Sequence, residues 1–325
     1  MFDRLDFASF HSADPVEREE FCSKLISSLK QYGFVKLINH GVSPLDIDNA
    51  FNETRRFFEL PLDQKLKSPH PPSPNPHRGY SAFGIENVST HSNYGSIAKL
   101  PLLKDMKESY DIGSEHDELY SNIWPPAGVQ DTFQPTLTSF FSACYQAEID
   151  ILDALSIGLG LPAQTLSQLH VKRSNELRLT HYPAAPRKDF AHSTRIATHT
   201  DFGTITLLFQ DAVGGLQVES PFGSGEFVDI ESGGRHECII NAGDCLQKWT
   251  GLHSARHRVH LPKPSQGGEF DQTEDIVDGR FSIAYFVKPD RAVRLCPLLE
   301  TKELKDEGTY VTAGEFQQMR IQGTY

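Results

Sequence analysis

The sequence predicts a mainly β fold of the sandwich or jelly-roll type, with a layer of helices packed on the β core. From about residue 175 onward, short strand-like segments alternate with turn-forming residues. Before that point, apolar residues recur at helical spacing. The 325 residues include 24 Gly and 20 Pro, which suits a fold with many turns. No flexible linker separates the two halves, so we expect one structural unit.

The first 65 residues predict strands alternating with helices. Short strands are expected at LDFASF (5–10) and at FVKLINHG (34–41). Between them, Asp14 has the residue type of an N-cap and Gly33 that of a helix stop, which bound a predicted helix. The segment PLDIDNAFNETRRFFEL (44–60) predicts a second helix.

The rest of the chain predicts a loop, a long helix and a series of strands. The Pro-rich segment 67–80 cannot pair inside a sheet, so it is either a plain connector or a mobile segment at the mouth of a site. Residues 131–162 predict a long helix that ends at Gly-Leu-Gly-Leu-Pro. The expected strands are NELRLTHY (175–182), TITLLFQ (204–210), GGLQVES (214–220), HECIINAG (236–243), ARHRVHL (255–261) and GRFSIAYFV (279–287).

Composition restricts the classes of partner and the compartment. The formal net charge is −12 and no basic run is present, so we expect no nucleic-acid partner. The five cysteines are widely spaced and form no C-x-x-C pair, which indicates a reducing compartment rather than a disulfide framework. We see neither a signal peptide nor an apolar run long enough to span a membrane. The expected protein is cytoplasmic, binds no membrane and shows no sign of an obligatory protein partner.

Two histidines precede an acidic residue by two positions, the spacing that puts both side chains on one face of a strand. His116 and Glu118 lie in a charged segment without strand character, which is typical of solvated surface. His199 and Asp201 stand at the head of the apolar run TITLLFQ. One such pair is weak evidence, because about one is expected by chance in a chain of this kind.

The pair at 199 and 201 has a candidate third partner on another strand. Two His and one carboxylate on one side of a metal leave open positions and favour non-haem Fe(II). The segment SARHRVHL offers His257, with His253 and His260 nearby. We choose His257 because Arg-Val follows it, and keep His253 as the alternative.

The last predicted strand carries a candidate carboxylate site. Arg280 and Ser282 share one face of this strand, and Phe281 and Ile283 point to the other. A guanidinium binds a carboxylate with two hydrogen bonds and stays charged when buried. Arg280 alone is most simply a surface or salt-bridged residue. The ordered set His-x-Asp, His and Arg-x-Ser is harder to attribute to chance.

These motifs identify a family resemblance over nearly the whole chain. The sequence resembles the isopenicillin N synthase-like branch of Fe(II)/2-oxoglutarate-dependent oxygenases, most of all its fungal members of specialised metabolism. The matching segments are YGFVKLINHGV, FFELPLDQKLK, HRGYSAFG, HTDFGTITLLFQDAVGGLQV, INAGDCLQKWT, RHRV, RFSIAYFV and TAGEFQQMRIQGTY.

The resemblance implies a double-stranded β-helix, or jelly roll, with helices packed outside. Residues 1–120 would form an N-terminal α/β region that does not fold independently, and residues 121–325 the catalytic core. The resemblance also implies roles for six residues. The expected Fe(II) ligands are His199, Asp201 and His257, and the expected contacts of the distal carboxylate of 2-oxoglutarate are Arg280, Ser282 and Tyr182.

The chain departs from the family pattern in three places. Thr180 stands where the family has Asn in its N-x-Y-P segment. The hairpin between Trp249 and His257 is about two residues shorter than usual. A polar segment within 258–279 precedes Arg280 and makes the gap after His257 longer than in plant-like members, although fungal members carry a similar insert. It is either a surface loop or a lid over the substrate.

The implied activity is dioxygenase chemistry with Fe(II), 2-oxoglutarate and O2. The enzyme would oxidise a C–H bond of a small molecule, in hydroxylation or in desaturation, ring closure or ring expansion, and release succinate and CO2. Two alternatives remain open from the sequence. The first is a 2-oxoglutarate-independent iron oxidase that closes a ring, since isopenicillin N synthase uses its Arg-x-Ser pair for a substrate carboxylate. The second is a jelly-roll protein that binds a ligand without turnover.

Overall fold

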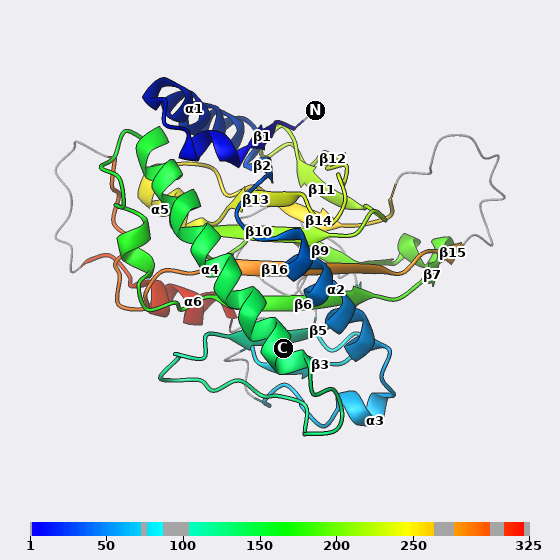
Figure 1. The fold of residues 1–325 in the computed structure, drawn as a ribbon. Helices are drawn as coiled ribbons and strands as arrows, with labels where there is room; N and C mark the ends of the chain where they lie inside the picture. The colour runs from blue at the N-terminus through cyan, green and yellow to red at the C-terminus, as the bar shows by residue number, and fades with distance from the viewer. Residues whose placement is uncertain (1, 73–76, 87–103, 263–275, 300–308, 322–325) are drawn as a thin grey trace.

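Two β sheets face each other, and helices cover the outer face of the larger one (Figure 1). The computed structural model describes residues 2–72, 77–86, 104–262, 276–299 and 309–321. The larger sheet has the strand order β1 (Arg4–Asp6), β2 (Phe34–Ile38), β13 (Cys238–Ala242), β10 (Ile205–Gln210), β16 (Arg280–Val287), β6 (Glu176–Tyr182), β5 (Glu108–Gly113) and β3 (Gly79–Ser81).

The smaller sheet has the order β12 (Phe227–Asp229), β11 (Leu216–Glu219), β14 (His257–Val259) and β9 (Ile196–His199). All its pairs are antiparallel. The predicted jelly-roll fold is confirmed. Two further pairs of short strands lie outside these sheets: β4 (Lys104–Asp105) with β8 (Ser193–Thr194), and β7 (Ala185–Pro186) with β15 (Ile276–Val277).

Strand alternation gives the large sheet an outer face that is packed in the main core and an inner face that carries both polar and apolar side chains. On β16, Ile283, Tyr285 and Val287 are buried in the main core beneath the helices. Arg280 and Ser282 of the same strand line a cavity on the other face. Successive strand residues point to opposite faces, so one strand supplies both the core and the site.

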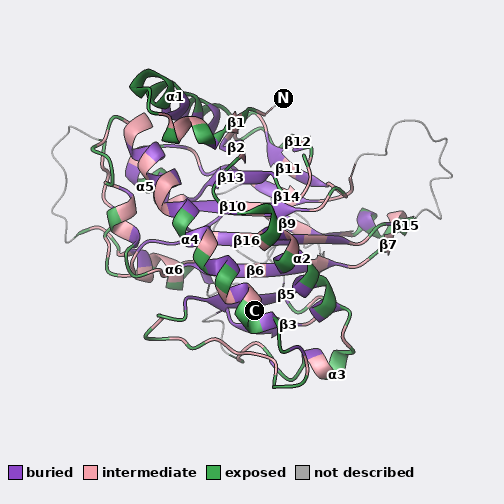
Figure 2. Ribbon diagram, viewed as in Figure 1, coloured by how far each residue is buried: buried purple, intermediate pink, exposed green. Residues whose placement is uncertain are grey.

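Three long helices complete the main core: α1 (Pro15–Tyr32), α2 (Pro44–Phe58) and α4 (Phe133–Gly158). Their buried sides face the sheet and one another, and their outer sides are exposed (Figure 2). The predicted start of α1 is confirmed, since the Asp14 carboxylate accepts a hydrogen bond from the Val16 amide at 2.9 Å. Its end is confirmed at Gly33, which has a left-handed φ of 70° that favours glycine.

The shorter helices connect or flank the sheets. They are α3 (Leu62–Lys65), α5 (Asp244–Thr250), α6 (Ala313–Ile321) and the 3-10 helices η1 (Phe7–His11), η3 (Ser167–His170) and η4 (Arg187–Ala191). No helix in the described part of the chain is both long and apolar enough to cross a membrane.

The prediction of a strand over residues 5–10 is correct at Leu5 and Asp6 and wrong from Phe7 onward. The strand β1 stops at Asp6, whose carboxylate accepts a hydrogen bond from the Ala8 amide and starts η1. The turn of η1 buries Phe7 against Phe21 of α1, with ring centroids 5.3 Å apart. A local cap and one aromatic contact therefore override the apolar alternation. Most of the insert within 258–279, including any lid there, lies outside the described residues.

Candidate active site

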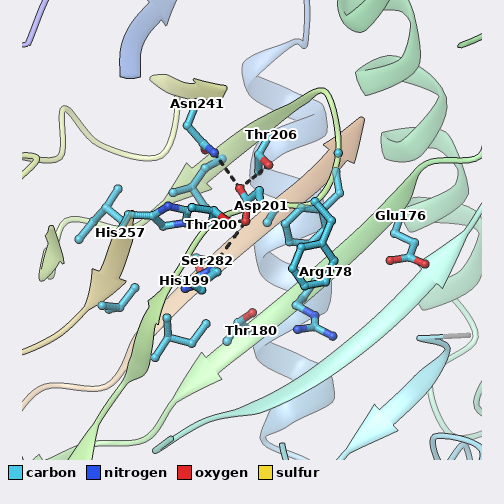
Figure 3. A pocket seen from close by; sticks show the side chains of 18 of the residues that line it. Glu176, Arg178, Thr180, His199, Thr200, Asp201, Thr206, Asn241, His257 and Ser282 are labelled. Carbon is cyan, nitrogen blue, oxygen red and sulfur yellow. Dashed lines mark hydrogen bonds and ion pairs between the residues drawn. The ribbon is translucent and has the colours of Figure 1, made fainter. Parts of the chain in front are cut away.

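A cavity lies between the two sheets and is lined by both (Figure 3). The large sheet contributes the inner faces of β6, β10, β13 and β16, and the small sheet contributes β9, β11 and β14. From the Pro-rich loop, His77 reaches the same cavity. All six expected site residues line it: His199, Asp201, His257, Arg280, Ser282 and Tyr182.

Three of these residues converge on one point. His199 ends β9 and is the register partner of His257, which begins β14. Asp201 follows two residues after His199. The three side chains each offer a ligand atom, and these atoms lie within 4.8 Å of one another. The Asp201 Oδ1 atom is 3.7 Å from His199 Nε2 and 3.8 Å from His257 Nε2.

Backbone carbonyls orient both imidazoles. His199 Nδ1 is 2.8 Å from the Ala197 carbonyl, and His257 Nδ1 is 3.1 Å from the Ala255 carbonyl. A carbonyl only accepts, so each Nδ1 is the protonated nitrogen and each Nε2 presents a lone pair. Both Nε2 atoms face Asp201 Oδ1.

The other oxygen of Asp201 is held from β10 and β13. Its Oδ2 accepts hydrogen bonds from Thr206 Oγ1 at 2.6 Å and Asn241 Nδ2 at 2.7 Å (Figure 3). Burial acts to raise the pKa of Asp201, but the positive charges that His257 and His199 carry when protonated and these two hydrogen bonds hold it below its usual value. Two imidazole nitrogens and one ionised carboxylate oxygen that face the same point are a suitable ligand set for a divalent iron ion. Such a set binds the ion from one side and leaves its other side open.

Close backbone packing explains why glycine occupies position 203, two residues after Asp201. A Cβ on Gly203 would lie 2.4 Å from the Val287 carbonyl oxygen, and one on Gly243 would lie 2.3 Å from the Gly203 carbonyl oxygen. The Asp244 amide donates to the Asp201 carbonyl at 2.8 Å. The turn that presents Asp201 is therefore clamped between β16 and the start of α5.

A second group of residues gathers at the start of β16. Arg280 is buried and pairs in register with Tyr182 of β6, while Ser282 pairs with Thr180. The Arg280 guanidinium donates to Ser282 Oγ at 3.2 Å and to Gln210 Oε1 at 2.7 Å, and its Cζ lies 4.9 Å from the centre of the Tyr182 ring. Arg280 makes no ion pair with any residue of the described ranges, which leaves a buried cation for an incoming carboxylate to neutralise.

Sequence reasoning missed a second buried arginine here. Arg195 lies just before β9, and its Cζ is 5.9 Å from the centre of the Tyr182 ring. Within the described chain its Nε and Nη1 have no hydrogen-bond partner. Burial, with the nearby charge of Arg280, lowers the pKa of Arg195 to about 10. Thr206 and Asn241 were also missed. Asn241 is 40 residues from Asp201 along the chain, and Thr206 reaches the carboxylate only because the chain bends between Asp201 and β10.

The alternative histidines point elsewhere. His253 packs against Phe222, with ring centroids 4.2 Å apart, and does not line the cavity. His260 Nδ1 is 3.2 Å from Thr194 Oγ1. The strand β14 thus places His257 beside His199 and Asp201, whereas His253 and His260 lie elsewhere. His116 and Glu118 are both exposed on the surface, as expected.

Comparison with known proteins decides the family. Residues 174–289 match the model of the 2OG-Fe(II) oxygenase superfamily, and residues 3–127 match that of the N-terminal region of a non-haem dioxygenase in morphine synthesis. The proline hydroxylase buaE of Petromyces alliaceus is 41% identical over 329 residues, covering 99% of each chain. The chain belongs to the Fe(II)- and 2-oxoglutarate-dependent oxygenases.

Further relatives agree with this family. The 2-oxoglutarate-dependent dioxygenase frbA of Dothideomycetidae sp. is 41% identical over 328 residues, covering 99% of this chain and 96% of the relative. A full-length Neurospora crassa protein, solved in complex with alpha-KG and thymine, has a TM-score of 0.84 and 32% identity, covering 98% and 96% of the two chains. This oxygenase is therefore an oxidoreductase that uses Fe(II), 2-oxoglutarate and O2, and the predicted enzyme class and cofactors are confirmed.

Proposed function

We propose that this oxygenase oxidises a C–H bond of a small molecule of specialised metabolism and that six residues form its catalytic centre. His199, Asp201 and His257 hold Fe(II), while Arg280, Ser282 and Tyr182 hold the distal carboxylate of 2-oxoglutarate. The observation that carries the proposal is the convergence of two imidazole Nε2 atoms and one carboxylate oxygen in the same cavity as a buried arginine that has no ion pair within the described chain.

The bound iron supplies the oxidising chemistry, and the protein supplies position, charge and a dry pocket. The carbonyls of Ala197 and Ala255 fix the tautomer of the imidazoles. Asn241 and Thr206 keep Asp201 ionised and oriented. Arg280 anchors the cosubstrate at the far end, so its keto acid end is directed toward the three ligands. Succinate and CO2 are the co-products.

Relatives support a small polar substrate. One is named a proline hydroxylase, and the Neurospora crassa structure was solved with thymine. The test is product stoichiometry: one succinate for each substrate molecule oxidised, with no substrate oxidation when 2-oxoglutarate is left out. Substrate oxidation that continues without 2-oxoglutarate would instead support the ring-closing oxidase alternative.

Replacing Asn241 with Ala weakens Fe(II) binding. The change removes one hydrogen bond that orients Asp201 and leaves a buried carboxylate oxygen less satisfied. Loss of such an orienting partner costs about 10- to 100-fold in metal affinity. Competition with a chelator of known affinity measures the change, with the exposed Asn49→Ala as control. Equal affinities in the two variants would contradict a positioning role for Asn241.

Replacing Arg195 with Met weakens 2-oxoglutarate binding by about tenfold, a loss of about 1.4 kcal/mol. Arg195 acts through Tyr182 and through its charge beside Arg280, so it is a positioning residue. Calorimetric titration of 2-oxoglutarate into the Mn(II)-loaded protein gives the affinity, and Arg195→Lys is expected to recover part of it. A lowered melting temperature with unchanged affinity would indicate a structural role alone.

The remaining expectations stay predictions. We propose that residues 1–120 do not fold without the rest of the chain, and this is supported by β1, β2, β3 and β5, which belong to the same sheet as β10 and β16. A cytoplasmic location is supported by the five free cysteines. The expected absence of a nucleic-acid, membrane or obligatory protein partner likewise stays a prediction.

A further inference from the structure

Gln210 lies beside Arg280, the expected anchor of the cosubstrate carboxylate. It ends β10 and pairs in register with Ser282 of β16, so both side chains belong to the inner face of the large sheet. Ser282 lines the cavity (Figure 3), as does Arg280. Gln210 is completely buried and does not line it. Any effect of Gln210 on a bound molecule is therefore transmitted through Arg280.

The contact with Arg280 fixes the orientation of the Gln210 amide. Arg280 Nη2 donates to Gln210 Oε1 at 2.7 Å. Because a guanidinium only donates, the amide atom that faces it must be the oxygen. The other amide atom, Nε2, is buried and has no hydrogen-bond partner in the described part of the chain. Among the described residues, Arg280 is therefore the single polar partner of this side chain.

Packing alone does not explain a buried amide with one partner. A buried polar atom without a hydrogen bond costs free energy, and an apolar side chain of similar length would fill the same space without that cost. Half of the Gln210 amide carries this cost, because Nε2 is unpaired within the described chain. What the amide contributes is the hydrogen bond that orients the Arg280 guanidinium.

Both hydrogen-bond acceptors of the Arg280 guanidinium are neutral. They are Gln210 Oε1 and the Ser282 hydroxyl, which lies 3.2 Å from Arg280 Nη1. The carboxylate that follows in sequence, Asp211, is turned to the backbone instead, where its Oδ2 accepts from the Phe281 amide at 2.6 Å. Arg280 is thus oriented without being neutralised, and its positive charge stays available to an anion in the cavity.

We propose that Gln210 is a positioning residue that determines the selectivity for the cosubstrate. It orients Arg280 through a neutral acceptor, and this neutrality is what favours a 2-oxo acid with a distal carboxylate. A glutamate at position 210 would form an ion pair with Arg280 and leave no net positive charge for the cosubstrate. The proposal rests on the proposed function, because it assumes that Arg280 receives the distal carboxylate.

The test compares two 2-oxo acids on the native protein and on Gln210→Glu. 2-Oxoglutarate ends in a carboxylate, whereas 2-oxopentanoate has the same keto acid end and chain length but ends in a methyl group. Each is titrated anaerobically into the Fe(II)-loaded protein, and the visible charge-transfer absorption gives the dissociation constant. We expect the native protein to prefer 2-oxoglutarate at least about 100-fold, and Gln210→Glu to prefer it less than about fivefold.

The affinity for 2-oxopentanoate separates a lost charge from a damaged site. In Gln210→Glu it is expected to stay within about threefold of the native value, because the keto acid end does not depend on the charge at position 210. Gln210→Met keeps the length of the side chain but removes the acceptor. Arg280 then keeps its charge and loses one orienting hydrogen bond, so we expect an intermediate loss of 2-oxoglutarate affinity, about tenfold.

Gln217→Glu is the matched control. Gln217 of β11 accepts a hydrogen bond from Arg258 Nε at 2.7 Å, which is the same contact between an amide oxygen and a guanidinium. Neither Gln217 nor Arg258 lines the cavity. We expect this variant to prefer 2-oxoglutarate as strongly as the native protein does. The melting temperature of each metal-free protein reports whether it is folded.

The outcomes separate this proposal from the proposed function. A folded Gln210→Glu protein with the native preference for 2-oxoglutarate, or one that loses both acids equally, overturns the role of Gln210 and leaves the catalytic centre standing. If Gln210→Glu does not fold, Gln210→Met decides: native affinity for 2-oxoglutarate overturns the proposal, and a loss confined to 2-oxoglutarate supports it. Failure of the iron-loaded native protein to bind 2-oxoglutarate would overturn the catalytic centre itself.

Discussion

Replacing Asp201 with Ala abolishes Fe(II) binding and succinate formation while the protein remains folded. The change removes the one carboxylate oxygen that faces both imidazole Nε2 atoms, so two neutral nitrogens remain where the ion needs three donors. His199→Ala and His257→Ala are expected to have the same effect. Bound iron is measured by metal analysis after dialysis, and activity by succinate release. We expect both to fall to the detection limit.

Matched variants show whether the loss is specific. His116 and Glu118 repeat the His-x-acid spacing on a surface segment, so His116→Ala and Glu118→Ala are expected to bind iron as the native protein does. The melting temperature of the metal-free proteins reports folding. A folded Asp201→Ala protein that still binds iron and forms succinate would show that the assigned residues are not the ligands.

Replacing Arg280 with Met raises the dissociation constant of 2-oxoglutarate about 100-fold, a loss of about 3 kcal/mol. The buried guanidinium makes no ion pair with a residue of the described chain, so the cosubstrate carboxylate is its expected counter-charge. The variant offers that carboxylate only the Ser282 hydroxyl and Tyr182. Titration of the Mn(II)-loaded protein with 2-oxoglutarate measures the affinity, and Fe(II) binding is expected to be unchanged.

The conservative variant separates charge from geometry. Arg280→Lys keeps the positive charge but loses the planar fork, so we expect an affinity between those of the native protein and Arg280→Met. Binding of 2-oxoglutarate to Arg280→Met with native affinity would contradict the assignment of this end of the cavity. Loss of iron together with 2-oxoglutarate would instead point to a general disturbance of the site.

Local sequence signals were sufficient to predict the ends of a helix when nearby residues determine them. Asp14 and Gly33 bound α1 as expected, because a side-chain cap and a left-handed glycine act within a few residues. The face of β16 that carries Arg280 and Ser282 followed from strand alternation. The switch from β1 to η1 was missed, because the Asp6 cap was not recognised and the packing of Phe7 against α1 joins separate segments.

The contacts that complete the site were hidden from the sequence because they join distant strands. Asn241 is 40 residues from Asp201 along the chain, and its amide reaches the carboxylate only because β13 lies beside β10. Gly203 also depends on a contact between separate segments, because a Cβ at this position would lie too close to the Val287 carbonyl oxygen. The ion pair between Arg178 and Asp111 was missed for the same reason, since Asp111 lies on the neighbouring strand β5.

The most direct test of the catalytic centre is an anaerobic titration of the Fe(II)-loaded protein with 2-oxoglutarate. Chelation of iron by the keto acid produces a visible charge-transfer absorption. We predict that the native protein develops this absorption and that Arg280→Met needs about 100-fold more 2-oxoglutarate to reach it. Asp201→Ala is expected to develop none. An iron-loaded native protein that binds no 2-oxoglutarate, or an Asp201→Ala protein with the full absorption, would contradict the catalytic centre described above.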